Sequence, residues 1–211
     1  MTDTLDAAAH RTRNKAMATA SVAIASFALG ALTSYAQGFL PDDARSFANS
    51  ASGWTLVTAG LVFWSRLPAR WAAPLGATSF VLLVLGYTVA AEFRGFHYEP
   101  LRFSVVGFVV GPFIGTAAAW LRASPLPAAL ATSLLAGIGI GEATYGLTTI
   151  SETTSPAYWV AIGIVGVALV VAMIANRIRG APSVATVLVG TPVVACVFIV
   201  AFRVLGGVGL A

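Results

Sequence analysis

The sequence predicts an all-α polytopic membrane protein, a bundle of seven transmembrane helices. Hydrophobic residues make up 58% of its 211 residues and charged residues only 9%, with a mean hydropathy of +0.86. Soluble domains carry about 25% charged residues, so this chain lacks the polar groups to cover a surface that faces water. Apolar runs of about 20 residues, the length that crosses the hydrocarbon of a bilayer, recur along the chain. The short segments between these runs alternate between basic and acidic or mixed charge.

The apolar runs define the expected helices in order. We expect helices at about 16–37, 49–65, 72–91, 103–121, 127–147, 157–176 and 184–205. The second run is the weakest, because several hydroxyl side chains dilute it. Residues 1–15 are polar and rich in alanine, and we expect them to form a disordered cytoplasmic tail. Residues 16–205 then form a single transmembrane domain, and 206–211 a short C-terminal tail.

The basic residues give the orientation. With the N-terminus in the cytoplasm, eight basic residues fall in or beside short cytoplasmic segments: Arg11, Arg13, Lys15, Arg66, Arg70, Arg122, Arg177 and Arg179. Three fall in outer loops (Arg45, Arg94 and Arg102), and Arg203 lies near the outer end of the last helix. This positive-inside bias predicts seven crossings of the plasma membrane with an extracytoplasmic C-terminus, whereas six crossings would break the alternation. A signal peptide cleaved near Ala36 is the alternative for the first run.

Small residues indicate how the helices pack. Gly107, Gly111 and Gly115 repeat every four residues, as do Gly137 and Gly141. Such stripes let helix backbones approach closely in lipid, so we expect helix–helix contacts along both.

Most of the remaining polar and aromatic residues in the helices fall in one layer, toward the outer side of the membrane. Amides, aromatic rings and an acid–base pair above an apolar floor are typical of a small-molecule pocket. The candidate ligand-binding residues are Gln37, Asn49, Trp54, Tyr87, Glu142, Tyr145 and Arg203. Structural alternatives remain for several of these polar and aromatic residues. Gln37 can satisfy loop backbone, Asn49 and Ser50 can cap the second helix, and Tyr158 with Trp159 can belong to an interfacial aromatic belt.

Glu142 is the strongest candidate. An unpaired charge at the bilayer centre costs about 2.5–3.5 kcal/mol on insertion scales, and less near the interface, so a charge in a helix needs a reason. Tyr145 follows three residues later on the same helix face. Arg203 lies at similar depth and is the expected counter-ion. The pair can lock two helices together or take part in a ligand or ion site, and the two roles are compatible.

Catalytic, cofactor and metal sites find no support in the sequence. Only His10 and His97 exist, one in the tail and one in a loop, and Cys196 is a lone cysteine that we expect to be buried. The net charge of +4 is spread in ones and twos at helix ends, which is typical of topology signals and not of a nucleic-acid surface. We therefore predict no catalytic residues, no cofactor, no metal and no nucleic-acid partner.

Several segments resemble an uncharacterised family of small actinobacterial multi-pass membrane proteins. These are Ala36-Gln-Gly-Phe-Leu-Pro41, Phe47-Ala-Asn-Ser50 with Trp54, Gly86-Tyr87, Gly111-Pro112 with Gly115, Trp120 with Arg122, and Gly141-Glu142-Ala143 with Tyr145. The resemblance covers about residues 30–145, includes Gln37, Asn49, Trp54, Tyr87 and Glu142, and does not include Arg203. It implies a multi-pass membrane protein and supplies no activity.

Two classes of function follow. The first is binding or transport of a small polar or amphipathic molecule through an outward-facing pocket. The second is a structural or regulatory subunit of a larger membrane complex, with a membrane partner or a second copy of the chain. The two functions differ in what the outer polar residues contact. In the first they surround an open pocket, and in the second they pack against and hydrogen-bond to one another. A lipid-modifying enzyme that uses Glu142 as a base is a third, weaker option.

Overall fold

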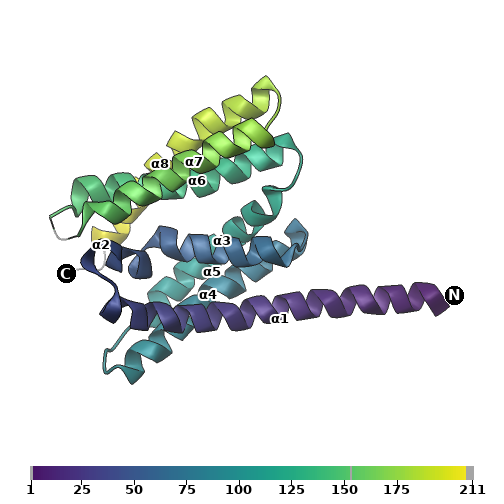
Figure 1. Cartoon of the computed structure of the whole chain (residues 1–211), viewed down its shortest axis with the longest axis horizontal. Helices are drawn as coiled ribbons and strands as arrows, with labels where there is room; N and C mark the ends of the chain where they lie inside the picture. Colours follow the sequence, from purple (N-terminus) through teal and green to yellow (C-terminus); the bar gives the residue numbers. More distant parts are fainter. Residues whose placement is uncertain (1, 153, 208–211) are drawn as a thin grey trace. The chain divides into compact units, whose positions relative to one another are not determined.

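Helices make up nearly all of the computed structural model, which describes residues 2–152 and 154–207. Along the chain they are α1 (Thr2–Phe39), α2 (Asp42–Arg45), the 3₁₀ helix η1 (Ser46–Asn49), α3 (Ala51–Ser65), α4 (Ala69–Phe93), α5 (Pro100–Trp120), α6 (Pro125–Thr149), α7 (Pro156–Asn176) and α8 (Ala181–Gly207) (Figure 1). No strand occurs among the described residues, which confirms the all-α class.

Six helices are long and apolar enough to cross a membrane: α1, α4, α5, α6, α7 and α8. The predicted second span forms a helix too, but α3 has only 15 residues. At about 1.5 Å per residue it is about 22 Å long, less than the roughly 30 Å of bilayer hydrocarbon. The fold is therefore that of an integral membrane protein with six clear candidate spans and one shorter apolar helix.

The two ends of the chain differ from the expected tails. Where the sequence predicted a disordered tail over 1–15, α1 continues back to Thr2 and is 38 residues long. Its first turns extend past the ends of α4 and α5 (Figure 1). Ala7, Ala8 and Ala9 have high helix propensity, which favours this continuation. At the other end α8 reaches Gly207, and the remainder of the predicted 206–211 tail lies outside the described residues.

The chain divides into two compact units. The first unit comprises Met1–Tyr35 and Val57–Ala119, and the second Ala36–Leu56 and Trp120–Ala211. No soluble linker separates the two units, so hydropathy and composition do not mark the division.

In the first unit α1 and α4 run parallel. The hydroxyls of Ser26 and Ser79 are 2.7 Å apart, and farther along both helices Gly30 lies directly against the backbone of Leu83. Near their C-terminal ends the Arg94 guanidinium donates to the carbonyl oxygen of Ser34. Contacts that advance in the same direction along both helices establish the parallel pairing.

The glycine stripe of α5 packs on α4. An added Cβ would lie 2.6 Å from Cα of Ala77 at Gly111, and 3.0 Å from Cα of Gly76 at Gly115. Gly107 lies against the ring of Phe80, so this contact runs in the antiparallel sense. The prediction of a close helix–helix contact along this stripe is confirmed.

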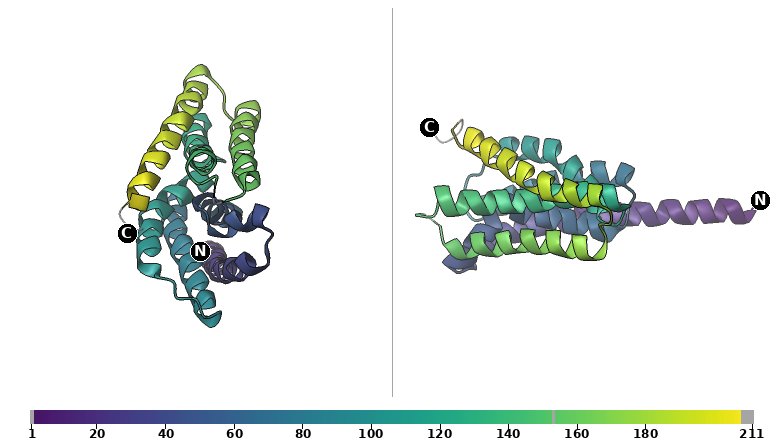
Figure 2. Two further views of the ribbon diagram at one scale, coloured as in Figure 1. Left: turned by 90° about the vertical axis from the view of Figure 1, so that its left-hand side faces the viewer. Right: turned by 90° about the horizontal axis from the view of Figure 1, so that it is seen from above.

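In the second unit α6 packs on both α7 and α8 (Figures 1 and 2). The glycines of α6 let the backbone of α8 approach: an added Cβ would lie 2.5 Å from Val194 Cβ at Gly137 and 2.9 Å from the Ala195 carbonyl at Gly141. The predicted close helix–helix contact along Gly137 and Gly141 is therefore confirmed. Because the contacts advance in the same direction along both helices, α6 and α8 run parallel. Between these two in the chain, α7 returns antiparallel to α6, with Trp159 against Gly146.

Large apolar side chains cover the outward faces of several helices. Phe108 of α5 is 69% exposed, Ile164 of α7 63% and Val197 of α8 63%. Such surfaces suit hydrocarbon and not water. Cys196, expected to be buried, lies exposed on α8. The reason is that the side of α8 that packs on α6 carries Thr191 and Ala195, and the next residue points away.

Candidate functional site at the start of α3

Glu142 caps the N-terminus of α3. Its Oε1 accepts a hydrogen bond from the backbone N–H of Ala51 at 2.8 Å, and its Oε2 accepts one from the N–H of Ser52 at 2.6 Å. These are the first two amides of the helix, which have no partner inside it. The positive end of the helix dipole also favours a negative charge at this point. With only 2% of its surface exposed, Glu142 is a buried carboxylate held by main-chain donors.

Ser50 completes the cap. It has extended backbone angles immediately before the helix, and its Oγ accepts a hydrogen bond from the N–H of Gly53 at 2.9 Å. The same oxygen lies 2.6 Å from the hydroxyl of Tyr158 on α7. An added Cβ at Gly53 would collide with the carbonyl of Phe47, so glycine lets η1 fold back against the start of α3. The capping interpretation of Ser50 is confirmed, whereas the side chain of Asn49 lies outside the described residues.

Tyr158 and Trp159 are buried, with exposures of 8% and 3%, so they are not the exposed rings that the interfacial-belt alternative requires. The Trp159 Nε1–H donates to Thr154 Oγ1 at 2.9 Å, and its indole packs where Gly146 has no side chain. The two rings meet edge to face with centroids 4.9 Å apart. Gly146 leaves room for the Trp159 indole, and the hydroxyls of Thr154 and Ser50 provide hydrogen-bond partners for Trp159 and Tyr158. These contacts cannot be predicted from the position of an aromatic residue at a helix end.

The loop before α7 is tied to α2. The Ser155 hydroxyl donates to the carboxylate of Asp43, and the same Oγ accepts the N–H of Ala157 at 3.3 Å. In this part of the second unit, polar side chains therefore bond to one another and to helix ends.

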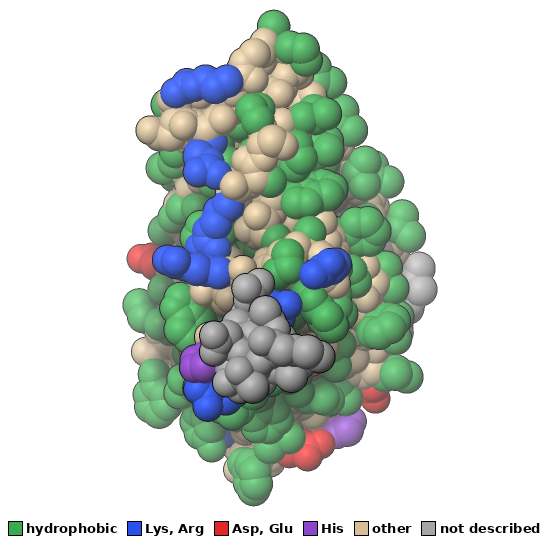
Figure 3. All heavy atoms as spheres, turned by 90° about the vertical axis from the view of Figure 1, so that its right-hand side faces the viewer, with side chains coloured by type: hydrophobic (Ala, Val, Ile, Leu, Met, Phe, Trp, Pro, Cys, Tyr) green, Lys and Arg blue, Asp and Glu red, His purple; other side chains and the backbone are tan. Residues whose placement is uncertain are grey.

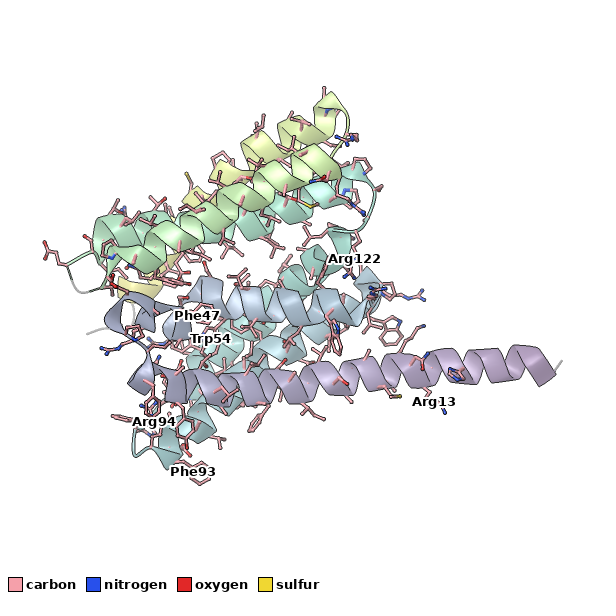
Figure 4. The ribbon with its side chains drawn as sticks, in the orientation of Figure 1. Arg13, Phe47, Trp54, Phe93, Arg94 and Arg122 are labelled. Atoms are coloured by element: carbon pink, nitrogen blue, oxygen red, sulfur yellow. The ribbon has the colours of Figure 1, made fainter. Side chains whose placement is uncertain are left out.

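Of the seven candidate ligand-binding residues, the structure brings some together and separates others. Trp54 is buried in the first turn of α3, close to Glu142 in its cap, and Figure 4 shows it and Phe47 near the start of that helix. Gln37 is half-buried near the end of α1. Tyr145 is half-buried on α6, with its ring 5.5 Å from that of Phe202.

Arg203 does not pair with Glu142, and Tyr87 belongs to the other compact unit. Arg203 is exposed on α8, and Glu142 bonds to backbone amides, so the expected ion pair between these two side chains is not formed. Tyr87 belongs to the first unit, where its ring meets Tyr98 edge to face at 4.7 Å. Burial and the neighbouring Tyr87 raise the pKa of the Tyr98 phenol.

Sequence reasoning missed the partners of Glu142 because it looked for a cation. One signal was present. A capping box places Glu or Gln three residues after the N-cap, but here that position is Gly53. Because Gly53 cannot supply the carboxylate of a capping box, the amides at the start of α3 are open to an acid from elsewhere in the chain, and Glu142 accepts two of them.

The arrangement around Glu142 suits a structural role, in which the carboxylate holds the start of α3. The two carboxylate oxygens already accept short hydrogen bonds, and no group of three or more His, Cys, Asp or Glu residues that could hold a metal ion occurs within the described part of the chain.

Comparison with known proteins gives one match. A model for a family of unknown function, DUF6518, matches residues 9–207, so the chain belongs to that family. No curated protein and no solved structure matches.

Proposed function

We propose that this member of the DUF6518 family is a structural or regulatory subunit of a larger complex in the plasma membrane, acting through a membrane partner or a second copy of itself. The observation that supports this most is the cap of Glu142 on α3. The carboxylate that was the strongest ligand-binding candidate stabilises a helix end.

The surrounding contacts favour the same function. Tyr158 is hydrogen-bonded to Ser50, Trp159 to Thr154 and Ser155 to Asp43, so these polar side chains are hydrogen-bond partners of one another. A ligand that pulled Glu142 out of the cap would break two amide hydrogen bonds of 2.6 and 2.8 Å at a buried group. Leaving a buried amide unsatisfied costs about 1–3 kcal/mol, which opposes ligand binding at this carboxylate.

The proposal includes seven crossings, with the N-terminus in the cytoplasm and the C-terminus outside. Because α1 and α4 run parallel, the segment between them has to return across the membrane. The longest helix of that segment is the apolar α3, so α3 together with its flanking residues would make this crossing. The positive-inside bias of the arginines supports this orientation. An actinobacterial origin, suggested by the motifs, belongs to the same proposal.

A second function, the binding or transport of a small polar molecule through an outward-facing pocket, is favoured by a different observation. The hydroxyl of Thr58 on α3 is fully buried and has no hydrogen-bond partner among the described residues. A buried hydroxyl without a partner calls for a water or a ligand group. In this second proposal Gln37, Asn49, Trp54, Tyr87, Glu142, Tyr145 and Arg203 remain the candidate ligand-binding residues.

Native mass spectrometry of the detergent-purified protein distinguishes the two functions. The wild type is compared with Glu142→Gln and with the control Glu152→Gln, which removes an exposed carboxylate from a loop. The subunit proposal predicts a discrete homo-oligomer or heteromeric partner, and no non-lipid adduct that depends on Glu142. A small-molecule adduct present in the wild type and in Glu152→Gln but absent from Glu142→Gln would contradict it and establish a ligand site.

A further inference from the structure

We propose that a cluster of three arginines in the second unit binds the headgroup of an anionic phospholipid. The cluster, called here the arginine corner, consists of Arg122 after α5 and of Arg177 and Arg179 between α7 and α8. Nothing in the cap of α3 uses these residues. Their positive charge was explained above only as a topology signal.

The corner is held in a fixed conformation by the residue between two of its arginines. Ile178 is 1% exposed and packs in a cluster with Ala128, Ala129, Met173 and Val187. The N–H groups of Arg177 and Ile178 both donate to the carbonyl of Met173, at 2.9 and 2.8 Å, and Gly180 follows with a φ of +85°. Because Ile178 is fixed in the core, the residues on each side of it are turned outward. Arg177 and Arg179 are both exposed.

A hydrogen bond joins the two loops that carry the corner. The Arg177 Nη2 donates to the carbonyl oxygen of Arg122 at 2.6 Å. This bond uses one of the five N–H donors of the guanidinium, and the remaining donors have the planar fork geometry that matches a phosphate. Arg179 makes a longer contact, 3.5 Å from its Nη1 to the Ile174 carbonyl, so it too is held near the surface of α7.

The two loops that carry the corner are basic in sequence. Residues 120–126 and 174–186 contain these three arginines and no Asp or Glu. Figure 3 looks onto the side on which α6 and α8 begin, and Lys and Arg side chains lie on it. The N-terminal ends of two parallel helices add a smaller positive field at the same place.

A phospholipid fits this corner better than a soluble phosphate, because apolar side chains continue from it along the helices. Val171 of α7 is 60% exposed, Leu188 of α8 59% and Leu126 of α6 51%. These surfaces offer contacts to acyl chains one to two turns from the arginines. In the orientation proposed above the corner also faces the cytoplasmic leaflet, where anionic lipids attract basic residues.

The test is a native mass spectrometry titration of the purified full chain with phosphatidylglycerol, and with phosphatidylcholine as the neutral lipid. Each basic residue near an anionic lipid contributes roughly fivefold in affinity, so Arg177→Gln/Arg179→Gln is expected to weaken phosphatidylglycerol binding roughly thirtyfold. The control Arg13→Gln/Arg70→Gln removes the same charge from the first unit and is expected to change binding less than threefold. Phosphatidylcholine binding is expected to be equal in all variants.

Two further measurements keep the result interpretable. Arg179→Gln alone leaves the bond from Arg177 to Arg122 in place and is expected to weaken binding roughly fivefold, so a folding defect in the double variant does not decide the outcome. Equal losses in the corner and control variants, or no loss in either, would overturn the proposal. Displacement of phosphatidylglycerol by millimolar inorganic phosphate would also overturn it, because the site would then serve a soluble anion.

Discussion

Glu142 and Ser52 lie 90 residues apart in the chain, and a 2.6 Å hydrogen bond joins the carboxylate of the first to the backbone N–H of the second. The bond links the middle of a long glycine-rich helix to the start of a short one. It gives a buried acid a partner without a basic side chain. Most of the expected behaviour of this protein follows from that link.

Replacing Glu142 with Gln is expected to destabilise the protein by about 1–3 kcal/mol. Hydrogen bonds to a charged group contribute about this much, and one amide of α3 would then face an N–H₂ group instead of an oxygen. Thermal unfolding in detergent, followed by the loss of helical circular dichroism, gives the measurement. Glu152→Gln is the control, because Glu152 is exposed in a loop. Equal midpoints for Glu142→Gln and the wild type would contradict the capping role.

The hydroxyls of Ser50 and Tyr158 are expected to act as a pair. Ser50→Ala removes both the cap to Gly53 and the bond to Tyr158, so it should cost about 1–2 kcal/mol. Tyr158→Phe removes one hydroxyl and should cost about 1 kcal/mol. In the double variant the losses should be less than additive, with a coupling of about 1 kcal/mol. Tyr35→Phe is the control at an exposed tyrosine. Strictly additive losses would show that the two hydroxyls do not interact.

The α4–α5 contact is expected to reject even one methyl group. At Gly111 an added Cβ would lie 2.6 Å from Cα of Ala77, which is backbone and cannot rotate away. Gly111→Ala should therefore destabilise by about 1–3 kcal/mol. Gly60→Ala is the matched control, because nothing lies within 4 Å of its Cβ position, and the higher helix propensity of alanine should make it neutral or slightly stabilising. Unfolding midpoints of the two variants check this, and a neutral Gly111→Ala would refute the close contact.

Seven crossings predict a defined pattern of cysteine labelling. Cys196 is first replaced by alanine, and single cysteines are then placed at Ala69, His97 and Glu152. A membrane-impermeant maleimide should label positions 97 and 152 in intact cells, and position 69 only after permeabilisation. The reason is that α3 has to return the chain to the cytoplasm before α4 begins. Labelling of position 69 in intact cells would mean that α3 does not cross.

The sequence predicted the helices well because hydrophobic runs and proline or glycine breaks are local signals. The weak run at 49–65 corresponds to α3, and the glycine stripes of α5 and α6 lie at close contacts. The start of α1 was missed because a polar, alanine-rich segment can form a helix or remain disordered.

The site was predicted less completely. Glu142 was recognised as important because it is a charged residue inside an apolar helix. Its partners could not be predicted, because every residue except proline has a backbone N–H and the sequence does not show which of them a carboxylate contacts. Arg203 was chosen on charge and depth alone, and it lies exposed on α8. Tyr158 and Trp159 were assigned to the membrane interface since aromatic residues at helix ends usually lie there. The direction that a side chain faces around its helix depends on packing, which a single sequence does not give.

Hydrogen–deuterium exchange of the backbone amides at the start of α3 tests the central claim most directly. The wild type and Glu142→Gln are compared in the same detergent. Exchange is expected to accelerate at least about tenfold at Ala51 and Ser52 in the variant, because each loses a charge-assisted bond of more than about 1.4 kcal/mol. Amides in the middle of α4 should not change. Equal protection of Ala51 and Ser52 in both proteins would contradict the account, because Glu142 would then not hold the end of α3.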